Sequence, residues 1–144
     1  MNRLRDFHKF SPHARIIGSH TMGRAVMDID GILINYARGF VKHLEFKWMH
    51  EREMDAPQLA NIQMIADVWT QTDTVRRMYF GNGGCEVHDL HWKGFYIFRA
   101  GDNDELTNDH RWQLLIMHGR GNVEEHSGSS GAVRALSDIA RGAL

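Results

Sequence analysis

The chain has 144 residues, of which 42% are hydrophobic and 24% charged, the composition of a soluble single-domain globular protein. No stretch approaches the roughly 20 apolar residues that span a bilayer, and the polar, basic N-terminus lacks the apolar core of a secretion signal. The single cysteine, Cys85, excludes an internal disulfide framework and favours a reducing cytoplasm, while the net charge of −1 neither favours nor excludes a polyanionic partner.

Positive charge is concentrated at the start of the chain. Residues 1–24 contain a single acid, Asp6, against five basic residues, which are Arg3, Arg5, Lys9, Arg15 and Arg24. This segment is either a solvated arm or a surface that contacts phosphate groups.

A β-hairpin followed by a helix is predicted next. Residues 24–35, RAVMDIDGILIN, are rich in aliphatic and β-branched side chains and predict a strand. A turn at 36–39 separates them from 40–48, FVKHLEFKW, which alternate between polar and apolar residues as a strand does. After a charged loop, apolar residues at steps of three and four predict an amphipathic helix over 56–70, with Asp55 as its N-cap.

The second half of the chain contains further strands and a last helix. Strands are predicted at 78–80, 93–99 and 111–118. Residues 121–131, GNVEEHSGSSG, have the composition of a flexible linker. The following residues, 132–142, predict a short amphipathic helix.

These elements predict an α/β fold. We expect a single domain over residues 1–120, built on a central mixed β-sheet of four or five strands flanked by α-helices. A flexible Gly/Ser-rich linker and a short C-terminal helix would follow over 121–144.

Four charged residues share one face of the predicted hairpin. In an antiparallel pair the numbers of opposed residues add to a constant, and a turn centred on 36–39 sets it at about 75. The expected pairs are Ile32 with His43, Asp30 with Glu45, and Asp28 with Lys47. The opposite face carries Ile29, Leu33, Leu44, Phe46 and Trp48. Because side chains alternate along a strand, we expect a wet, charged face backed by a dry, apolar one.

Carboxylates gathered this closely need a counter-charge. Side chains whose Cβ atoms are about 5 Å apart interact directly, so neighbouring carboxylates repel one another. A hard divalent cation such as Mg²⁺ or Mn²⁺ removes the repulsion and keeps waters that a substrate phosphate can displace. Such an ion polarises a phosphoryl oxygen and activates a bound water. Lys47, two residues from Glu45, is placed to orient or deprotonate that water, or to stabilise the oxyanion.

The competing interpretation is a surface charge ladder. In that case Lys47 pairs with Asp28 and Glu45 is merely solvated, since cross-strand charge pairs are common and contribute little. Against it, Asp28 and Asp30 interrupt an otherwise aliphatic strand, and strands disfavour aspartate specifically. The pattern therefore favours a metal-dependent phosphodiesterase centre.

The motif D-I-D-G on one strand and E-F-K on the next, followed by an amphipathic helix, resembles the PD-(D/E)xK nuclease superfamily, which has the restriction-endonuclease-like fold. The resemblance covers about residues 24–70. It implies that Asp30 is the motif aspartate, Glu45 the motif acid and Lys47 the motif lysine. The backbone carbonyl of Phe46 would be a further metal ligand.

Two features of the aspartate strand leave the match open. Asp28 is a second metal ligand, or is itself the motif aspartate if the register differs. No proline precedes the aspartate, because Met27 and Ile29 stand there, and this departure makes the motif less specific.

The resemblance also implies substrate-binding residues outside the hairpin. His20 would replace the upstream acid that the family often has, or is an ordinary loop residue. Gln58 resembles a glutamine that some members place near the scissile phosphate, or is a solvated residue of the first helical turn. Arg24 and the basic segment before it would neutralise flanking phosphates.

The sequence thus predicts a cytoplasmic nuclease that uses Mg²⁺ or Mn²⁺ to hydrolyse DNA phosphodiester bonds. That the substrate is DNA follows from the family alone. A chain this small that cuts both strands would act as a homodimer, with 132–142 as a candidate interface. The alternative is a non-catalytic binding or assembly module that keeps the nuclease-like fold and in which the acids are incidental.

Overall fold

The structure, a computed structural model, describes residues 29–71, 74–81 and 83–144, without the side chains of 77 and 79. The chain divides into two compact units, Met1–Asp30 and Gly31–Leu144, and the second contains every element described below. In chain order these are β1 (Gly31–Asn35), β2 (Phe40–Lys47), α3 (Ala56–Trp69), β3 (Val75–Gly81), β4 (Gly84–Ala100), β5 (Trp112–Gly119), β6 (Asn122–Gly128) and α4 (Ala132–Arg141). The fold is α/β with a mixed sheet, as predicted.

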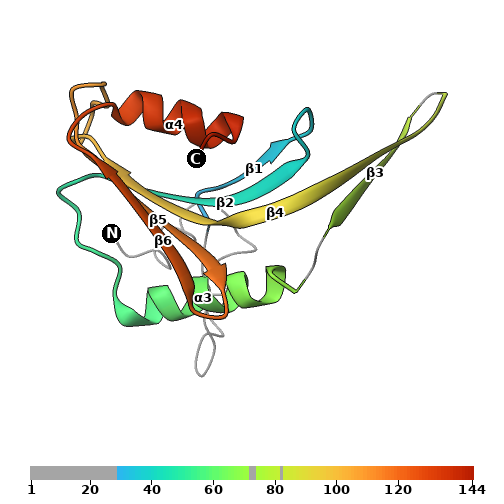
Figure 1. Cartoon of the computed structure of the whole chain (residues 1–144), viewed down its shortest axis with the longest axis horizontal. Helices are drawn as coiled ribbons and strands as arrows, with labels where there is room; N and C mark the ends of the chain where they lie inside the picture. The colour runs from blue at the N-terminus through green and yellow to red at the C-terminus, as the bar shows by residue number, and fades with distance from the viewer. Residues whose placement is uncertain (1–28, 72–73, 82) are drawn as a thin grey trace, which may run out of the picture. The chain divides into compact units, whose positions relative to one another are not determined.

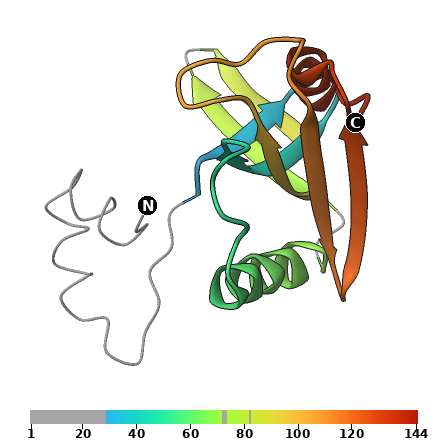
Figure 2. The same ribbon diagram turned by 90° about the vertical axis from the view of Figure 1, so that its left-hand side faces the viewer.

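The sheet is built around one parallel pair of strands. Its described strands lie in the order β1-β2-β4-β5-β6, with β3 attached to β4. Only β2 and β4 run parallel, from Phe40↔His91 to Lys47↔Arg99, and the other neighbours are antiparallel. Parallel neighbours need a crossover connection, which contains α3. Figure 1 and Figure 2 show α3 on one side of the sheet and α4 on the other.

The main apolar core lies between the sheet and α4. Its buried members are Tyr96, Phe98, Ala100, Leu114 and Ile116 from the sheet, with Ala132, Ala135 and Ile139 from α4. The α4 residues recur at steps of three and four, so they form one face of the helix. This confirms the predicted amphipathic helix and shows that its apolar face packs on the sheet of its own chain. No helix in the described part of the chain is long and apolar enough to cross a membrane.

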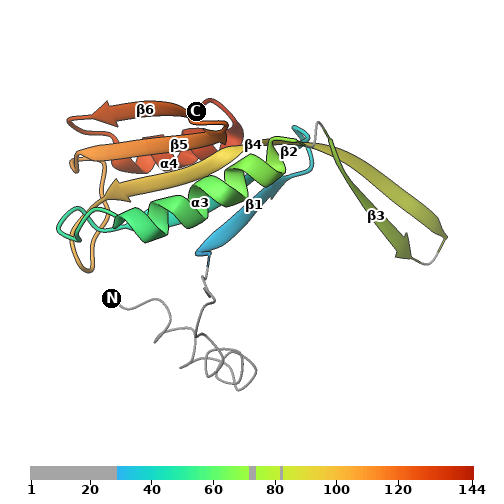
Figure 3. The ribbon, with the colours of Figure 1, turned by 90° about the horizontal axis from the view of Figure 1, so that it is seen from below.

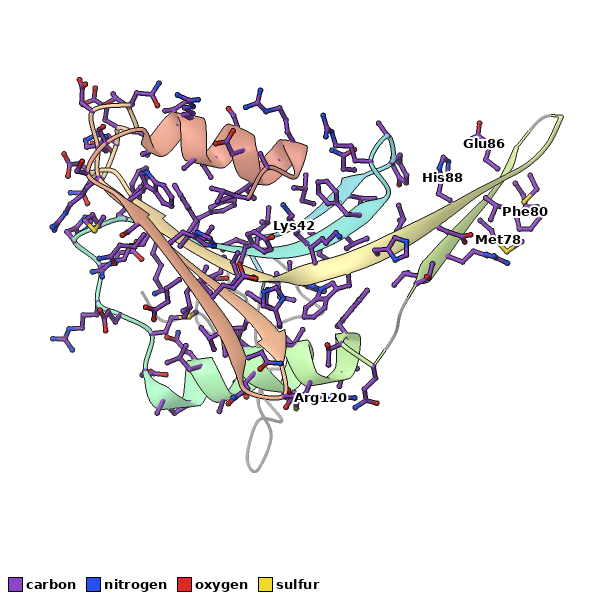
Figure 4. The ribbon with its side chains drawn as sticks, viewed as in Figure 1. Lys42, Met78, Phe80, Glu86, His88 and Arg120 are labelled. Atoms are coloured by element: carbon purple, nitrogen blue, oxygen red, sulfur yellow. The ribbon has the colours of Figure 1, made fainter. Side chains whose placement is uncertain are left out.

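A buried lysine joins β2 to the end of α4. Lys42 is 1% exposed, and its ammonium donates to the main-chain oxygens of Ile139 at 2.6 Å and Leu144 at 2.7 Å. The last carbonyls of a helix have no partner within the helix, so the Ile139 contact satisfies one of them. Burial, with repulsion from Lys93, lowers the pKa of Lys42 to about 8. Figure 4 shows Lys42 between the sheet and α4.

The described residues contain six strands where the sequence predicts four or five. The additional strand is β6, so the prediction of a flexible linker is wrong for residues 122–128. Most side chains of β6 are exposed, and main-chain pairing with β5 holds the strand instead of a buried face. The turn before it has positive φ at Arg120 (56°) and Gly121 (76°). Two such residues form a tight turn whose twist matches that of the flanking strands of a hairpin.

The β3 strand and the first half of β4 form a two-stranded arm. β3 pairs with β4 in an unbroken register from Val75↔Leu90 to Gly81↔Gly84. Beyond Leu90, β4 instead pairs with β2 and β5. Figure 3 shows the arm continuing beyond the edge of the sheet and α3 in front of the sheet, running roughly along β4.

Candidate active site

The β1–β2 hairpin has the register that the sequence predicts. Its pairs run from Gly31↔Leu44 to Asn35↔Phe40, and the residue numbers of each pair add to 75. The turn is closed by Gly39, whose N–H donates to the carbonyl of Asn35 at 2.8 Å. The pair Ile32 with His43 is therefore confirmed.

The aspartates of the motif come before this ladder begins. Asp30 is exposed and belongs to the first compact unit, and its expected pairing with Glu45 stays a prediction. Asp28 lies outside the described residues, as do His20 and Arg24. Their roles also stay predictions.

Glu45 is deeply buried, contrary to the expected wet face. It is 2% exposed and pairs in register with Ile97 of β4, whereas Phe46, expected on the dry face, is 43% exposed. The reason is the parallel partner β4, which makes β2 an interior strand. α3 then covers the Glu45 face, as the contact of Trp69 with His43 shows. The core under α4 is centred on β4 and β5, and only Leu33 and Leu44 of the expected apolar face pack against it.

Lys47 lies on the same face of β2 as Glu45, nearer the end of the strand. Its side chain is 11% exposed, and its Nζ lies 3.9 Å from Oε2 of Glu51 in the following loop. Burying a carboxylate and most of an ammonium costs free energy unless each group is paired with an opposite charge or binds a metal ion. A buried carboxylate beside a lysine that lines a cavity is a candidate functional site.

A cavity of about 580 Å³ opens over this face of the sheet. Ile97 and Leu115 form part of its floor, and Met54 before α3 and Leu59 in its first turns also line it. Lys47 lines one end of the cavity. Cavities of roughly 300–1,000 Å³ hold small-molecule ligands, so this space is large enough to receive part of a substrate next to Lys47.

Arg99 is a site residue that sequence reasoning missed. It stands opposite Lys47 in the parallel ladder and lines the same cavity. Its Nη2 donates to the main-chain oxygens of Met49, at 2.8 Å, and Glu51. Arg99 therefore fixes the loop that holds the Glu51 carboxylate near Lys47. An arginine at the end of the predicted strand KGFYIFR was the only available signal, and nothing in the sequence shows that this strand lies beside 40–48.

The donor chemistry at the end of β2 fits a hard divalent cation. In the part of the chain that the structure describes, no group of three or more His, Cys, Asp or Glu side chains could hold a metal ion. Zn²⁺ sites need such a group, but Mg²⁺ is bound through one or two carboxylates and keeps waters and substrate phosphates as its other ligands. The Glu45 carboxylate and the Phe46 carbonyl are oxygen donors of this kind. That they bind Mg²⁺ or Mn²⁺ stays a prediction.

Gln58 has a structural role at the start of α3. Its backbone N–H donates to Oδ1 of Asp55 at 2.9 Å, and its side-chain Oε1 accepts from the Asp55 N–H at 3.3 Å. This is a capping box, which satisfies two otherwise unpaired donors at the helix start. The capping box confirms Asp55 as the N-cap. It also explains the presence of Gln58 at this position without a contact to substrate.

Comparisons of the chain with protein-family models, with curated proteins and with solved structures give no match. The function therefore has to be argued from the residues and their geometry.

Proposed function

We propose that this protein is a divalent-metal-dependent nuclease that hydrolyses DNA phosphodiester bonds, with the restriction-endonuclease-like fold and a centre formed by Asp30, Glu45 and Lys47. One observation supports this most strongly. A carboxylate that is 2% exposed stands two residues from a lysine on the same face of β2, and this lysine lines a cavity. A solvated charge ladder would leave both side chains in water.

In this proposal the residues have distinct roles. Glu45 and the Phe46 carbonyl hold Mg²⁺ or Mn²⁺ together with Asp30, and Asp28 is a further ligand or replaces Asp30. The metal, when bound, supplies a Lewis acid for the phosphoryl oxygen and lowers the pKa of a bound water. Lys47 orients or deprotonates the attacking water, or stabilises the developing negative charge.

A second candidate is a non-catalytic binding or assembly module. In such a module the acids of β2 and of the segment before β1 are incidental. The two candidates differ in what a divalent cation does to the folded state.

Metal-dependent stabilisation separates the two. We expect Mg²⁺ or Mn²⁺ to raise the free energy of unfolding by about 1.4 kcal/mol at ten times its Kd and about 2.7 kcal/mol at a hundred times. Asp30→Asn and Glu45→Gln remove a ligand charge with little change in volume, and both should abolish the gain. Lys47→Met should keep it while DNA cleavage falls by roughly 10²–10⁴-fold. Thermal unfolding and plasmid nicking measure the two effects.

Asp104→Asn provides the control, because Asp104 is an exposed carboxylate in the loop between β4 and β5. It should leave both metal stabilisation and cleavage unchanged. A wild type that neither gains stability nor nicks plasmid with either ion would overturn the nuclease proposal. A gain that persists in both Asp30→Asn and Glu45→Gln would place the metal elsewhere.

A further inference from the structure

A row of polar side chains crosses the sheet from the candidate active site. Lys47 on β2 is opposite Arg99 on β4, Arg99 is opposite Gln113 on β5, and Gln113 is opposite Ser127 on β6. All four line the same cavity, so they share one face of the sheet. Neighbouring strands are about 4.8 Å apart, so this donor row extends about 14 Å from Lys47.

The donor row has the chemistry of a phosphate-binding track. Its members present an ammonium, a guanidinium, an amide and a hydroxyl, each of which donates hydrogen bonds to anionic oxygens. Lys47 and Arg99, the two cations, are at the end nearest Glu45. Glu53 lies 3.8 Å from Nη1 of Arg99, but its side chain is 88% exposed. Arg99 itself is only 20% exposed, but an ion pair at 3.8 Å with so exposed a partner contributes little, so a phosphate can compete with Glu53 for Nη1.

Apolar surface runs beside the donor row. The next positions inward on β4 and β5 are Ile97 and Leu115, which pair with each other and line the cavity. Met54, just before α3, and Leu59, in α3, line the same cavity. A track of donors beside apolar surface is the combination that binds single strands, because the backbone needs positive charge and the bases need a non-polar contact.

We propose that this groove binds an unpaired DNA strand and leads it into the candidate active site. The inference rests on the proposed nuclease function and names its substrate class: DNA with a single-stranded segment, as opposed to blunt duplex. Two observations favour that occupant. The cavity of about 580 Å³ has the size of a small-molecule site, which suits a nucleotide or two and is too small to enclose a double helix. The donor row also begins at Lys47, so a strand lying on it would reach the reacting centre.

Binding without cleavage tests the groove directly. A fluorescent single-stranded oligonucleotide and a blunt duplex of the same sequence would be titrated with the full chain in EDTA, followed by anisotropy. We expect the single strand to bind at least about tenfold more tightly, a difference of about 1.4 kcal/mol. The double variant Gln113→Leu/Ser127→Val should reduce single-strand binding by about tenfold. Both residues are exposed and lie outside the proposed catalytic centre, so the variant should fold, as circular dichroism would verify.

Two further variants make the test specific. Gln63→Leu changes the same residue type at an exposed position of α3 and should leave binding unchanged. Glu125, on β6 opposite Leu115, also lines the cavity. Glu125→Gln should tighten single-strand binding, because it removes a negative charge that repels the phosphates of the strand. Arg99 is not substituted in this test, because its side chain also holds the loop at Met49 and its loss would disturb that loop.

The outcomes separate this inference from the proposed function. If plasmid is cleaved with Mg²⁺ or Mn²⁺ but the double variant binds single strands like the wild type, the groove is wrong and the nuclease stands. Equal affinity for single strand and duplex leads to the same conclusion. If neither oligonucleotide binds and no DNA is cleaved, both proposals fail. Selective loss of single-strand binding in the double variant, with Gln63→Leu unaffected, establishes the groove.

Discussion

The surroundings of His43 in the interior of the sheet determine the protonation state of its side chain. It is 2% exposed, stacks on Phe95 with ring centroids 5.6 Å apart, and meets the edge of Trp69 at 4.8 Å. Its Nδ1 accepts a hydrogen bond from Nε1–H of Trp92 at 2.9 Å, so Nδ1 carries no proton. Burial lowers the pKa of His43 below its ordinary 6.5. The imidazole is therefore neutral in the folded protein at neutral pH.

This neutral histidine should make stability depend on pH in one direction. Well above pH 6.5 His43 is uncharged in both states. As the pH falls below 6.5 the unfolded chain takes up a proton before the folded chain does, so the free energy of unfolding decreases until the lowered pKa is reached, by at most about 1.4 kcal/mol per pH unit. Denaturant unfolding from pH 7.5 to 5.5 measures the slope. His43→Gln should flatten it, and equal slopes in both proteins would show that His43 does not contribute.

At the scale of single residues, the sequence predicts which residues pair across neighbouring strands better than it predicts which side chains are buried. The pairing of Ile32 with His43 follows from the position of the turn, which is local information. The burial of Glu45 and the exposure of Phe46 depend on β4, which begins at Gly84, well after the hairpin in the sequence. Alternation along one strand therefore separates two faces but does not show which face a later element will cover.

At the scale of elements, α3 is predicted well because its signals are local. Asp55 caps it, Pro57 stands in its first turn, and its boundaries, Ala56–Trp69, agree with the expected 56–70. β6 is missed because its residues NVEEHSG carry no apolar alternation, and the strand depends on main-chain pairing with β5. An edge strand with polar side chains leaves little trace in hydropathy.

The capping box predicts how α3 responds to substitution. Asp55→Ala leaves the N–H of Gln58 without its acceptor, and we expect the free energy of unfolding to fall by about 1 kcal/mol. Gln58→Ala should also lower stability, while DNA cleavage per folded molecule stays unchanged if the residue serves only the helix. Arg52→Ala, an exposed change in the preceding loop, should alter neither. A loss of cleavage in Gln58→Ala at full folding would restore its predicted role near the substrate.

At the scale of the whole described unit, the arm differs from the rest of the sheet. Met78 (52% exposed), Phe80 (73%) and Val87 (50%) share one of its faces, because Met78 pairs with Val87 and Phe80 with Cys85. In Figure 4, Met78 and Phe80 point to one side of the arm and Glu86 and His88 to the other. All three side chains stay at least half exposed among the described residues. A two-stranded ribbon without a packed face is marginally stable in water.

The arm should therefore open locally while the sheet stays folded. Amide hydrogens of β3 should exchange much faster than those in the last part of β4, from Phe95 to Ala100, and in β5. The side chains of these two segments are largely buried. Arg76 donates to both oxygens of Asp89 at 2.8 and 3.3 Å near the base of the arm, so Arg76→Ala should speed β3 exchange further without changing the melting temperature. Arg141→Ala removes a comparable exposed pair with Asp138 in α4 and should leave the arm unchanged. If β3 instead exchanged as slowly as β5, the face of Met78, Phe80 and Val87 would have to be covered in solution.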